Sequence, residues 1–415
     1  MRGLRNIIFI LIFSVGKLSA QQLTFPYVDS ATYAMYLKGD YNELIKLGSK
    51  AIKQGIDYPL LRVRMAEAAE LNNDFSTAEK IYRGIVITDT TNANAHYQVA
   101  QNNIFLNRYD IAEYYAPTLN VEQRKNLGLK KHALIESVNF EAGLKHPGDT
   151  SRGNAYFGSV GISSRLFYRW TLYQSITPYG QTVTDSDTTS SFPFHPAHIG
   201  QINYYAKLHG QIFPHLGVTA AFYHFSLSEK VTDWIPPQQN GPHMGPPTPP
   251  PTITQNGFYF VGGLRWNLPK LELHGEYVVG QMNSSSFSQM GVSFMYLPFG
   301  NLYSYVRGEC YYQLPTNSGN GNLVFIPTLG FKLQKKVWFE ATATFGTFNN
   351  LAQNEGAYFF NMYDTTKLRY GGTLFLLAGK KSIFTLNYLQ ETKLISNTNS
   401  TYQQPSITFG LQWKL

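Results

Sequence analysis

The chain of 415 residues has a single cysteine, Cys310, and few charged residues. One cysteine excludes an intramolecular disulfide framework. Charged residues make up 14% of the chain, and the net charge of +8 is spread along it without a dense block of lysine or arginine. This gives weak support for an acidic partner and argues against nucleic-acid binding. Beyond the N-terminus, no apolar run reaches the roughly 18 residues that a membrane-spanning helix needs.

Aromatic residues, in contrast, are abundant at 15% of the chain. A transmembrane β-barrel reconciles many aromatics with the absence of long apolar runs, because each strand needs only about ten residues of alternating polarity. Residues 406–415 (SITFGLQWKL) alternate strictly between apolar and polar or small side chains. This pattern resembles the closing strand of outer-membrane β-barrels, although the final residue is Leu415 and not an aromatic. The alternative is an edge strand of a soluble sandwich.

Residues 1–20 predict a secretory signal peptide. Arg2 and Arg5 precede an apolar core at 7–15, and cleavage is expected after Ala20. Export without disulfides is typical of a bacterial envelope protein.

Residues 28–131 switch to helical periodicity and form an internal repeat. The tripeptides Gly39-Asp40-Tyr41, Asn73-Asp74-Phe75 and Asn107-Arg108-Tyr109 lie 34 residues apart. Their first residues suit left-handed turns between helices. The spacing resembles that of the tetratricopeptide (TPR) family, which implies paired helices that bind peptides or partner proteins on a concave face. The alternative is that these helices only brace a barrel mouth. The expected packing residues of the repeat are Tyr41, Ala66, Phe75, Ala78, Ala100, Tyr109 and Ala112.

Residues 133–415 predict an antiparallel transmembrane β-barrel, which gives the chain a two-domain α + β fold. Short connections alternate with long ones, as they do between the two ends of an outer-membrane barrel. We expect strands at 134–145, 155–166, 168–182, 200–212, 217–227, 257–268, 271–281, 287–297, 301–313, 321–333, 337–347, 368–378, 382–393 and 404–414.

An even number of strands places the helical repeat and the C-terminus on the same side, in the periplasm. Residues 357–362 have some strand character, but a fifteenth strand would break this parity, so we assign them to a long loop at 348–367. The proline-rich stretch 236–251 predicts another long external loop, which could plug the lumen, reach a partner or be disordered.

Charged side chains at alternate strand positions are expected to face the barrel lumen. One row, with His274 between Glu272 and Glu276, also has the residue types of a metal or acid–base site. We interpret it as a structural ladder of ion pairs that neighbouring arginines neutralise. The predicted lumen-lining residues are Glu141, Lys207, His209, Arg265, Glu272, His274, Glu276, Arg307, Glu309, Lys332 and Glu340.

The sequence offers no catalytic, cofactor-binding or metal site, so we do not expect an enzyme. A helical repeat before a C-terminal barrel resembles the YaiO-type outer-membrane β-barrel family and, more distantly, TPR-containing polysaccharide exporters. The first resemblance implies an envelope assembly or secretion component in the outer membrane, with lipid around the barrel and a periplasmic or secretion-system protein docked on the repeat. The second implies the alternative, a pore for a polysaccharide or small solute.

Overall fold

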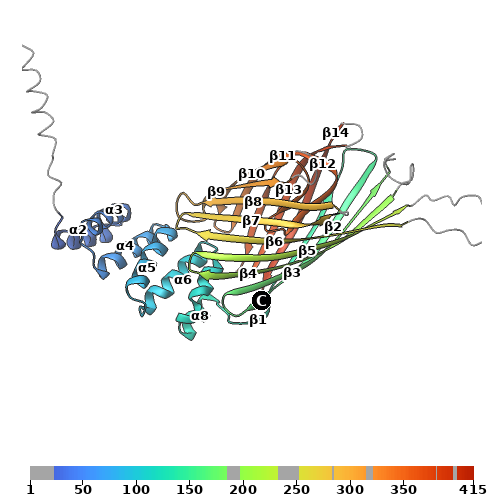
Figure 1. Cartoon of the computed structure of the whole chain (residues 1–415). Coiled ribbons are helices and arrows are strands. Elements are labelled where there is room, and N and C mark those ends of the chain that lie inside the picture. The colour runs from blue at the N-terminus through green and yellow to red at the C-terminus, as the bar shows by residue number, and fades with distance from the viewer. Residues whose placement is uncertain are drawn as a thin grey trace, which may run out of the picture.

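The computed structural model describes residues 23–184, 197–231, 252–282, 285–314, 321–379, 381–395 and 400–415. The expected signal peptide (1–20) and the proline-rich stretch 236–251 lie outside these ranges. Figure 1 shows a row of helices that projects from one end of a barrel of strands. We call this end of the barrel the helix-side mouth and the opposite end the far mouth. No helix among the described residues is long and apolar enough to cross a membrane.

The helical domain is a row of helices, which are α2 (Phe25–Lys38), α3 (Tyr41–Lys53), α4 (Pro59–Leu71), α5 (Phe75–Thr88), α6 (Ala93–Phe105), α7 (Tyr109–Tyr115), the 3₁₀ helix η1 (Ala116–Thr118) and α8 (Val121–Leu127). Each helix from α2 to α7 packs on the next, and α8 packs on α6.

Three turns between these helices have the same geometry, as their spacing predicts. Gly39, Asn73 and Asn107 have φ values of 81°, 58° and 59°, which confirms the expected left-handed conformation. After each of them, a backbone N–H reaches back over the helix end. Asp40 donates to the carbonyl of Met35, and the equivalent bonds recur 34 and 68 residues later. The repeat is therefore visible in the hydrogen bonding as well as in the sequence.

The seven predicted packing residues do not all have the same environment. Ala66, Ala78, Ala100 and Ala112 are fully buried between helices. Tyr41 contacts Tyr36, and the Phe75 ring lies 4.8 Å from that of Phe105 in the following repeat. Tyr109 has no following repeat of this kind, and its ring lies 3.8 Å from Lys414 Nζ on the barrel. The last repeat therefore turns its aromatic residue toward the second domain.

Fourteen antiparallel strands close into a barrel in which β1 pairs with β14, from Ser137↔Lys414 to Lys145↔Ser406. This confirms the predicted fold class and strand number. The strands are β1 (Ala133–Lys145), β2 (Arg152–Leu166), β3 (Trp170–Val183), β4 (Ala197–Phe213), β5 (Leu216–Val231), β6 (Thr252–Asn267), β7 (Leu271–Met282), β8 (Ser285–Tyr296), β9 (Ser304–Gln313), β10 (Asn322–Gln334), β11 (Val337–Gln353), β12 (Tyr358–Ala378), β13 (Ser382–Leu394) and β14 (Thr401–Lys414).

The assignment of 348–367 to a loop is wrong. Strand β11 continues to Gln353 and β12 already begins at Tyr358, with residues 350–353 paired to 358–361. Residues 357–362 are therefore neither loop nor fifteenth strand, because most of them form the start of β12. The pairing register shifts on both sides of Phe348, and Gly346 has a φ of 110°. At this point the hairpin leaves the regular wall and turns into the lumen.

The wall has an apolar outer face and a polar inner face. Outward-facing side chains such as Ile202, Phe345 and Phe409 are 60%, 52% and 51% exposed. Inward-facing residues on the same strands, such as Gln201 and Ser406, are buried. An apolar exterior around a polar interior is the arrangement of a membrane-spanning barrel, because lipid surrounds the outside while the inside contacts water or protein.

Candidate functional site: the closed lumen

Residues 346–364, which we call the inner hairpin, cross the barrel lumen. The tip is the four-residue connection 354–357, in which the Ala357 N–H donates to the Asn354 carbonyl over 3.1 Å. Asn354, Glu355 and Gly356 have positive φ values of 55°, 57° and 81°, and positive φ at both central residues is typical of a type I′ turn. A glutamate in this conformation costs on the order of 1–3 kcal/mol unless its surroundings enforce it. The surroundings of Glu355 must therefore hold the turn in this conformation.

The Glu355 carboxylate is held by side chains from four different strands, β4 to β7. It accepts hydrogen bonds from Lys207 (2.9 Å), Arg265 (2.9 Å) and Thr219 (3.1 Å), and His274 Nε2 lies 3.3 Å away. The carboxylate side chain is only 3% exposed. Charge-assisted hydrogen bonds in such a dry site are strong. They fix the hairpin tip against the wall opposite its own strands.

The backbone of the hairpin tip is bound as well. The hydroxyl groups of Tyr205 and Tyr259 donate to the carbonyls of Glu355 (3.0 Å) and Gly356 (2.6 Å). The Glu355 N–H donates to the carboxylate of Glu276 over 3.1 Å. These bonds satisfy polar groups that the turn would otherwise bury without partners.

The side-chain amide of Gln289 forms hydrogen bonds with the inner hairpin that a neighbouring strand would otherwise supply. Gln289, on β8, donates to the Ala352 carbonyl over 2.5 Å and accepts from the Ala352 N–H over 3.3 Å. Both residues are fully buried. A glutamine that forms both bonds to one residue copies the hydrogen bonding of a neighbouring strand, so the lumen wall is built to receive this segment.

Aromatic packing fills the space around the hairpin. On one side, Leu351 and Phe348 pack against Tyr311, Val324 and Ile326. On the other side, the Phe359 ring is surrounded by four aromatic rings at centroid distances of 5.1–6.2 Å, those of Tyr223, Phe225, Tyr259 and Phe287. The inner hairpin therefore sits in the lumen as a packed element.

The base of the hairpin is tied to the far mouth. Asp364 accepts from Arg152 (2.9 Å) and from the Tyr402 hydroxyl (2.8 Å), and both charged side chains are buried. Nearby, Glu391 lies 3.5 Å from Lys393 Nζ and 3.7 Å from Lys145 Nζ. Charged contacts thus hold the hairpin at both ends, with an apolar layer between them.

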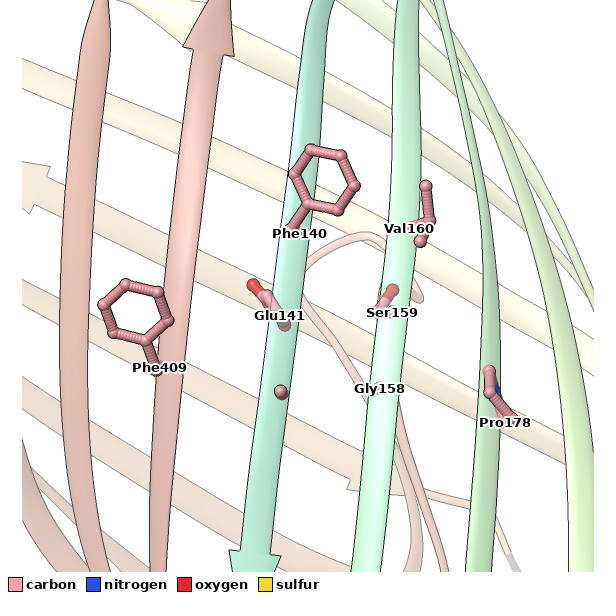
Figure 2. A pocket seen from close by; sticks show the side chains of 8 residues that line it. Phe140, Glu141, Gly158, Ser159, Val160, Pro178 and Phe409 are labelled. Carbon is pink, nitrogen blue, oxygen red and sulfur yellow. The ribbon is translucent and has the colours of Figure 1, made fainter.

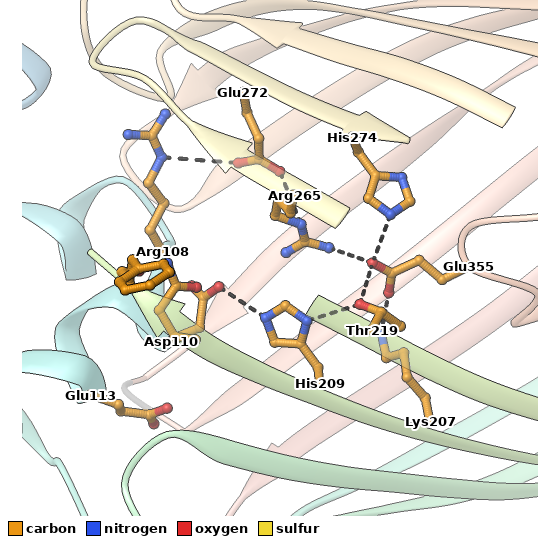
Figure 3. Close-up of polar contacts among 12 residues, drawn as sticks. Arg108, Asp110, Glu113, Lys207, His209, Thr219, Arg265, Glu272, His274 and Glu355 are labelled. Atoms are coloured by element: carbon orange, nitrogen blue, oxygen red, sulfur yellow. Dashed lines mark hydrogen bonds and ion pairs between the residues drawn. The ribbon is translucent and has the colours of Figure 1, made fainter. Parts of the chain in front are cut away.

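The helical domain docks on the helix-side mouth, and two of its side chains reach residues of the lumen wall (Figure 3). Asp110, at the start of α7, lies 3.0 Å from His209 Nε2 on β4. Arg108 donates to the Leu268 carbonyl over 3.1 Å, and its Nε lies 3.9 Å from the Glu272 carboxylate. Both helical side chains are largely buried. They contact the same wall residues that surround the hairpin tip.

Docking of the helical domain on the barrel changes the pKa of the Asp110 carboxyl. Burial alone would raise its pKa, but the hydrogen bond with His209 and the positive charge of Arg265 outweigh burial and lower the pKa below its usual value. The ionised aspartate is therefore the form that the docked domain stabilises.

A second set of contacts holds the helical domain to the rim of the barrel, outside the lumen network. Asp74 pairs with Lys270 at 2.8 Å, and the Ser76 N–H donates to the Gly300 carbonyl over 3.0 Å. Gly300 has a φ of 67°, and a Cβ there would lie 1.8 Å from Asp74 Oδ1. Only glycine at position 300 therefore permits this close approach of the two domains. In a third contact, Glu113 of α7 pairs with Arg165 on β2.

The structure divides the predicted lumen residues into two groups. Lys207, His209, Arg265, Glu272, His274 and Glu276 gather around the hairpin tip. The others lie elsewhere on the inner wall: Arg307 contacts Glu309 and Glu340, Lys332 lies over the rings of Tyr303 and Trp338, and Glu141 accepts from the Tyr358 hydroxyl.

The sequence patterns did not point to several residues at the centre of the site, among them Glu355, Thr219, Asp110 and Arg108. Glu355 fell in the segment assigned to a loop. Asp110 and Arg108 follow a repeat turn, where polar residues are ordinary. One signal was available for Glu355, because N-E-G has the glycine typical of a tight hairpin turn.

A groove also lies on the outer wall between β14, β1, β2 and β3 (Figure 2). Its volume is about 330 Å³, and Phe140, Val160, Pro178 and Phe409 are among its lining residues. Pro178 has no N–H, and the pairing of β2 with β3 is interrupted between Phe157↔Tyr179 and Val160↔Ile176. Because Phe140, Val160 and Phe409 are exposed on the apolar face, the groove opens toward lipid.

No protein-family model matches this chain, and no curated protein matches it. Solved structures with a similar shape include the toluene transporter TbuX of Ralstonia pickettii, with 12% identity, a TM-score of 0.45 and coverage of 68% of this chain and 90% of that one. A FadL homologue of Pseudomonas aeruginosa has 9% identity, a TM-score of 0.41 and coverage of 67% of this chain and 89% of that one. The translocator domain of the Neisseria meningitidis autotransporter NalP has 12% identity, a TM-score of 0.32 and coverage of 75% of this chain and 99% of that one.

The geometry itself defines the class. A closed sheet of fourteen antiparallel strands, apolar outside and charged inside, is an outer-membrane type β-barrel. This one carries an N-terminal helical domain on one mouth and an inner hairpin in its lumen.

Proposed function

We propose that the protein is a gated pore of the bacterial outer membrane, and that the inner hairpin is its plug. The observation that carries the proposal is the binding of Glu355 by Lys207, Arg265 and Thr219 on the opposite wall. The plug, although continuous with β11 and β12, is thus held in the lumen by side-chain contacts with strands to which it is not paired. In this proposal it leaves the lumen for transport, and the helical domain lies in the periplasm.

Barrel size supports the proposal. Eight strands enclose a space that their own side chains fill, whereas 16–18 strands leave an aqueous channel. With fourteen strands, the interior requires additional filling, and the hairpin supplies it. Its departure would expose a path lined by Lys207, Arg265, Glu276 and several tyrosine hydroxyls. Such a lining suits a polar solute or a glycan, and the role we propose is transport without a catalytic step.

The test is single-channel conductance of the refolded mature protein in a planar bilayer. Residues 347–366 are replaced by an Asn-Gly turn, which matches the two-residue loop geometry of a regular hairpin. We expect rare, brief openings of the wild-type protein and a steady open channel of the variant. Lys332→Met is the matched control, because Lys332 faces the lumen away from the plug. Silence of both the wild type and the shortened variant would contradict the proposal.

A second candidate function is docking of an envelope or secretion partner, as the YaiO-type and TPR resemblances imply. The supporting observation is a set of large apolar side chains exposed at the free end of the helical domain, with Phe25, Tyr33 and Leu37 at 54%, 53% and 68% exposure. The test is copurification from crosslinked envelopes. Changing these three residues to serine should remove a specific partner, and an unchanged set of copurified proteins would exclude this role.

A further inference from the structure

We propose that the helical domain is the latch of the plug: Asp110 and Arg108 hold the tip of the inner hairpin indirectly, so that displacement of the domain releases it. This inference rests on the proposed gated pore. It adds that opening is controlled from the helix-side mouth, through the polar network drawn in Figure 3.

The first branch of the network runs from Asp110 to Glu355 through His209 and Thr219. His209 Nε2 lies 3.0 Å from Asp110 Oδ2, and His209 Nδ1 lies 3.0 Å from the Thr219 hydroxyl. The same hydroxyl lies 3.1 Å from Glu355 Oε1. Three short contacts therefore connect the start of α7 with the hairpin tip.

The Thr219 hydroxyl contacts both His209 Nδ1 and the Glu355 carboxylate. Asp110 holds the other ring nitrogen, Nε2, and so fixes the ring orientation that keeps Nδ1 beside Thr219. Loss of Asp110 would free the ring to turn, and the Thr219 hydroxyl would lose the partner that positions it toward Glu355.

The second branch runs from Arg108 through Glu272 and Arg265. Arg108 Nε lies 3.9 Å from the Glu272 carboxylate, and Arg265 Nε lies 3.5 Å from the same carboxylate. Arg265 Nη2 also donates to Glu355 over 2.9 Å. Glu272 and Glu355 thus share Arg265. Withdrawal of Arg108 leaves Glu272 with Arg265 as its remaining partner in this branch, and the hold of Arg265 on Glu355 weakens.

Both branches can be broken without detaching the helical domain. The rim contacts between Asp74 and Lys270, Ser76 and Gly300, and Glu113 and Arg165 involve no residue of the network. A variant at Lys270 therefore loosens the same interface without entering either branch, which makes it the matched control.

The test measures how often the plug leaves the lumen. Leu351 is fully buried in the hairpin, and Cys310, the one native cysteine, is replaced by alanine. Leu351→Cys then reports plug release by its labelling rate with a membrane-impermeant maleimide in proteoliposomes. We expect Asp110→Ala and Arg108→Met to raise the rate about tenfold or more, as loss of a charged hydrogen bond predicts. Lys270→Ala should change it less than about twofold.

The outcomes separate the latch from the pore. If Glu355→Ala raises labelling but Asp110→Ala and Arg108→Met do not, the plug moves and the latch is wrong. An equal rise with Lys270→Ala would also overturn the latch, because general loosening of the interface would explain it. If Glu355→Ala leaves labelling unchanged and the shortened variant does not conduct, the gated pore itself is wrong. The helical signal in the far-UV circular dichroism spectrum of each variant shows whether the helical domain remains folded.

Discussion

Two elements contact the inner wall of the barrel, the inner hairpin and the helical domain, and they are attached differently. The hairpin is an extension of the wall strands β11 and β12, and it is held by buried contacts such as Glu355–Lys207 and Gln289–Ala352. The helical domain is a separate fold, held by several charged pairs and backbone hydrogen bonds around the rim.

This difference predicts different responses to substitution. The hairpin tip depends on a few buried groups, and removing one of them leaves others without a partner, which is costly. The domain interface distributes its contacts over several sites of the rim. The Asp74–Lys270 pair is partly exposed, and such pairs contribute about 0–1 kcal/mol, whereas the Glu113–Arg165 pair is buried. Single changes should therefore open the hairpin more readily than they detach the domain.

The largest effect is expected from Glu355→Ala. Without the buried carboxylate, Lys207 and Arg265 lose their shared partner. Because these two side chains are 25% and 28% exposed, we expect a cost toward the lower end of the roughly 3–5 kcal/mol of a fully buried pair. We expect frequent or permanent opening in single-channel recordings. Glu340→Gln is the control, because Glu340 faces the lumen but contacts Tyr305 and Arg307. Equal opening by both variants would show that lumen charge in general, and not the plug contact, controls the channel.

The next effect concerns the point where the hairpin leaves the wall. Gly346 has a φ of 110°, and a Cβ there would lie 2.2 Å from the Leu323 carbonyl oxygen. We expect Gly346→Ala to lower the free energy of unfolding by about 1–3 kcal/mol, from denaturant titration in detergent. At Gly275, a Cβ would meet no atom within 4 Å, so Gly275→Ala is the control. Equal stability of the two variants would mean that the hairpin path does not depend on Gly346.

A smaller and more local effect is expected at the rim. In Gly300→Ala, the new methyl group collides with Asp74, 1.8 Å from its carboxylate, so the helical domain must shift. We expect limited proteolysis to release the helices faster while the barrel stays intact. Gly262→Ala, with open space around its Cβ position, should leave the proteolysis pattern unchanged. Protection equal to the wild type would show that this contact does not support docking.

The smallest effect is a dependence on acid. The pKa of Asp110 is lowered in the folded protein, so its contribution to docking is complete above the ordinary aspartate pKa of about 4. It is lost as the pH falls through the lowered value. We expect the melting temperature of the helical signal to fall below about pH 4 by more in the wild type than in Asp110→Asn. If the melting temperatures of the wild type and Asp110→Asn fall equally with pH, Asp110 does not contribute to the acid dependence.

The alternation of polar and apolar residues already predicts much of the barrel. Strands such as 271–281 and 382–393 lie within one residue of their observed bounds, because each strand carries its own two-residue period. The helix turns at Gly39, Asn73 and Asn107 were equally readable from their spacing. The inner hairpin was not, because a segment with protein on both sides has no solvent-facing or lipid-facing period to reveal it.

The sequence by itself determined the wall of fourteen strands, the face that each clear strand presents to lipid, and the left-handed turns of the helical repeat. These features are local, since a side chain's direction follows from its position in the strand or turn. Only the tertiary structure decided that Glu355 meets Lys207 and Arg265, and that Asp110 meets His209. These partners are distant in sequence, and closure of the barrel brings them together.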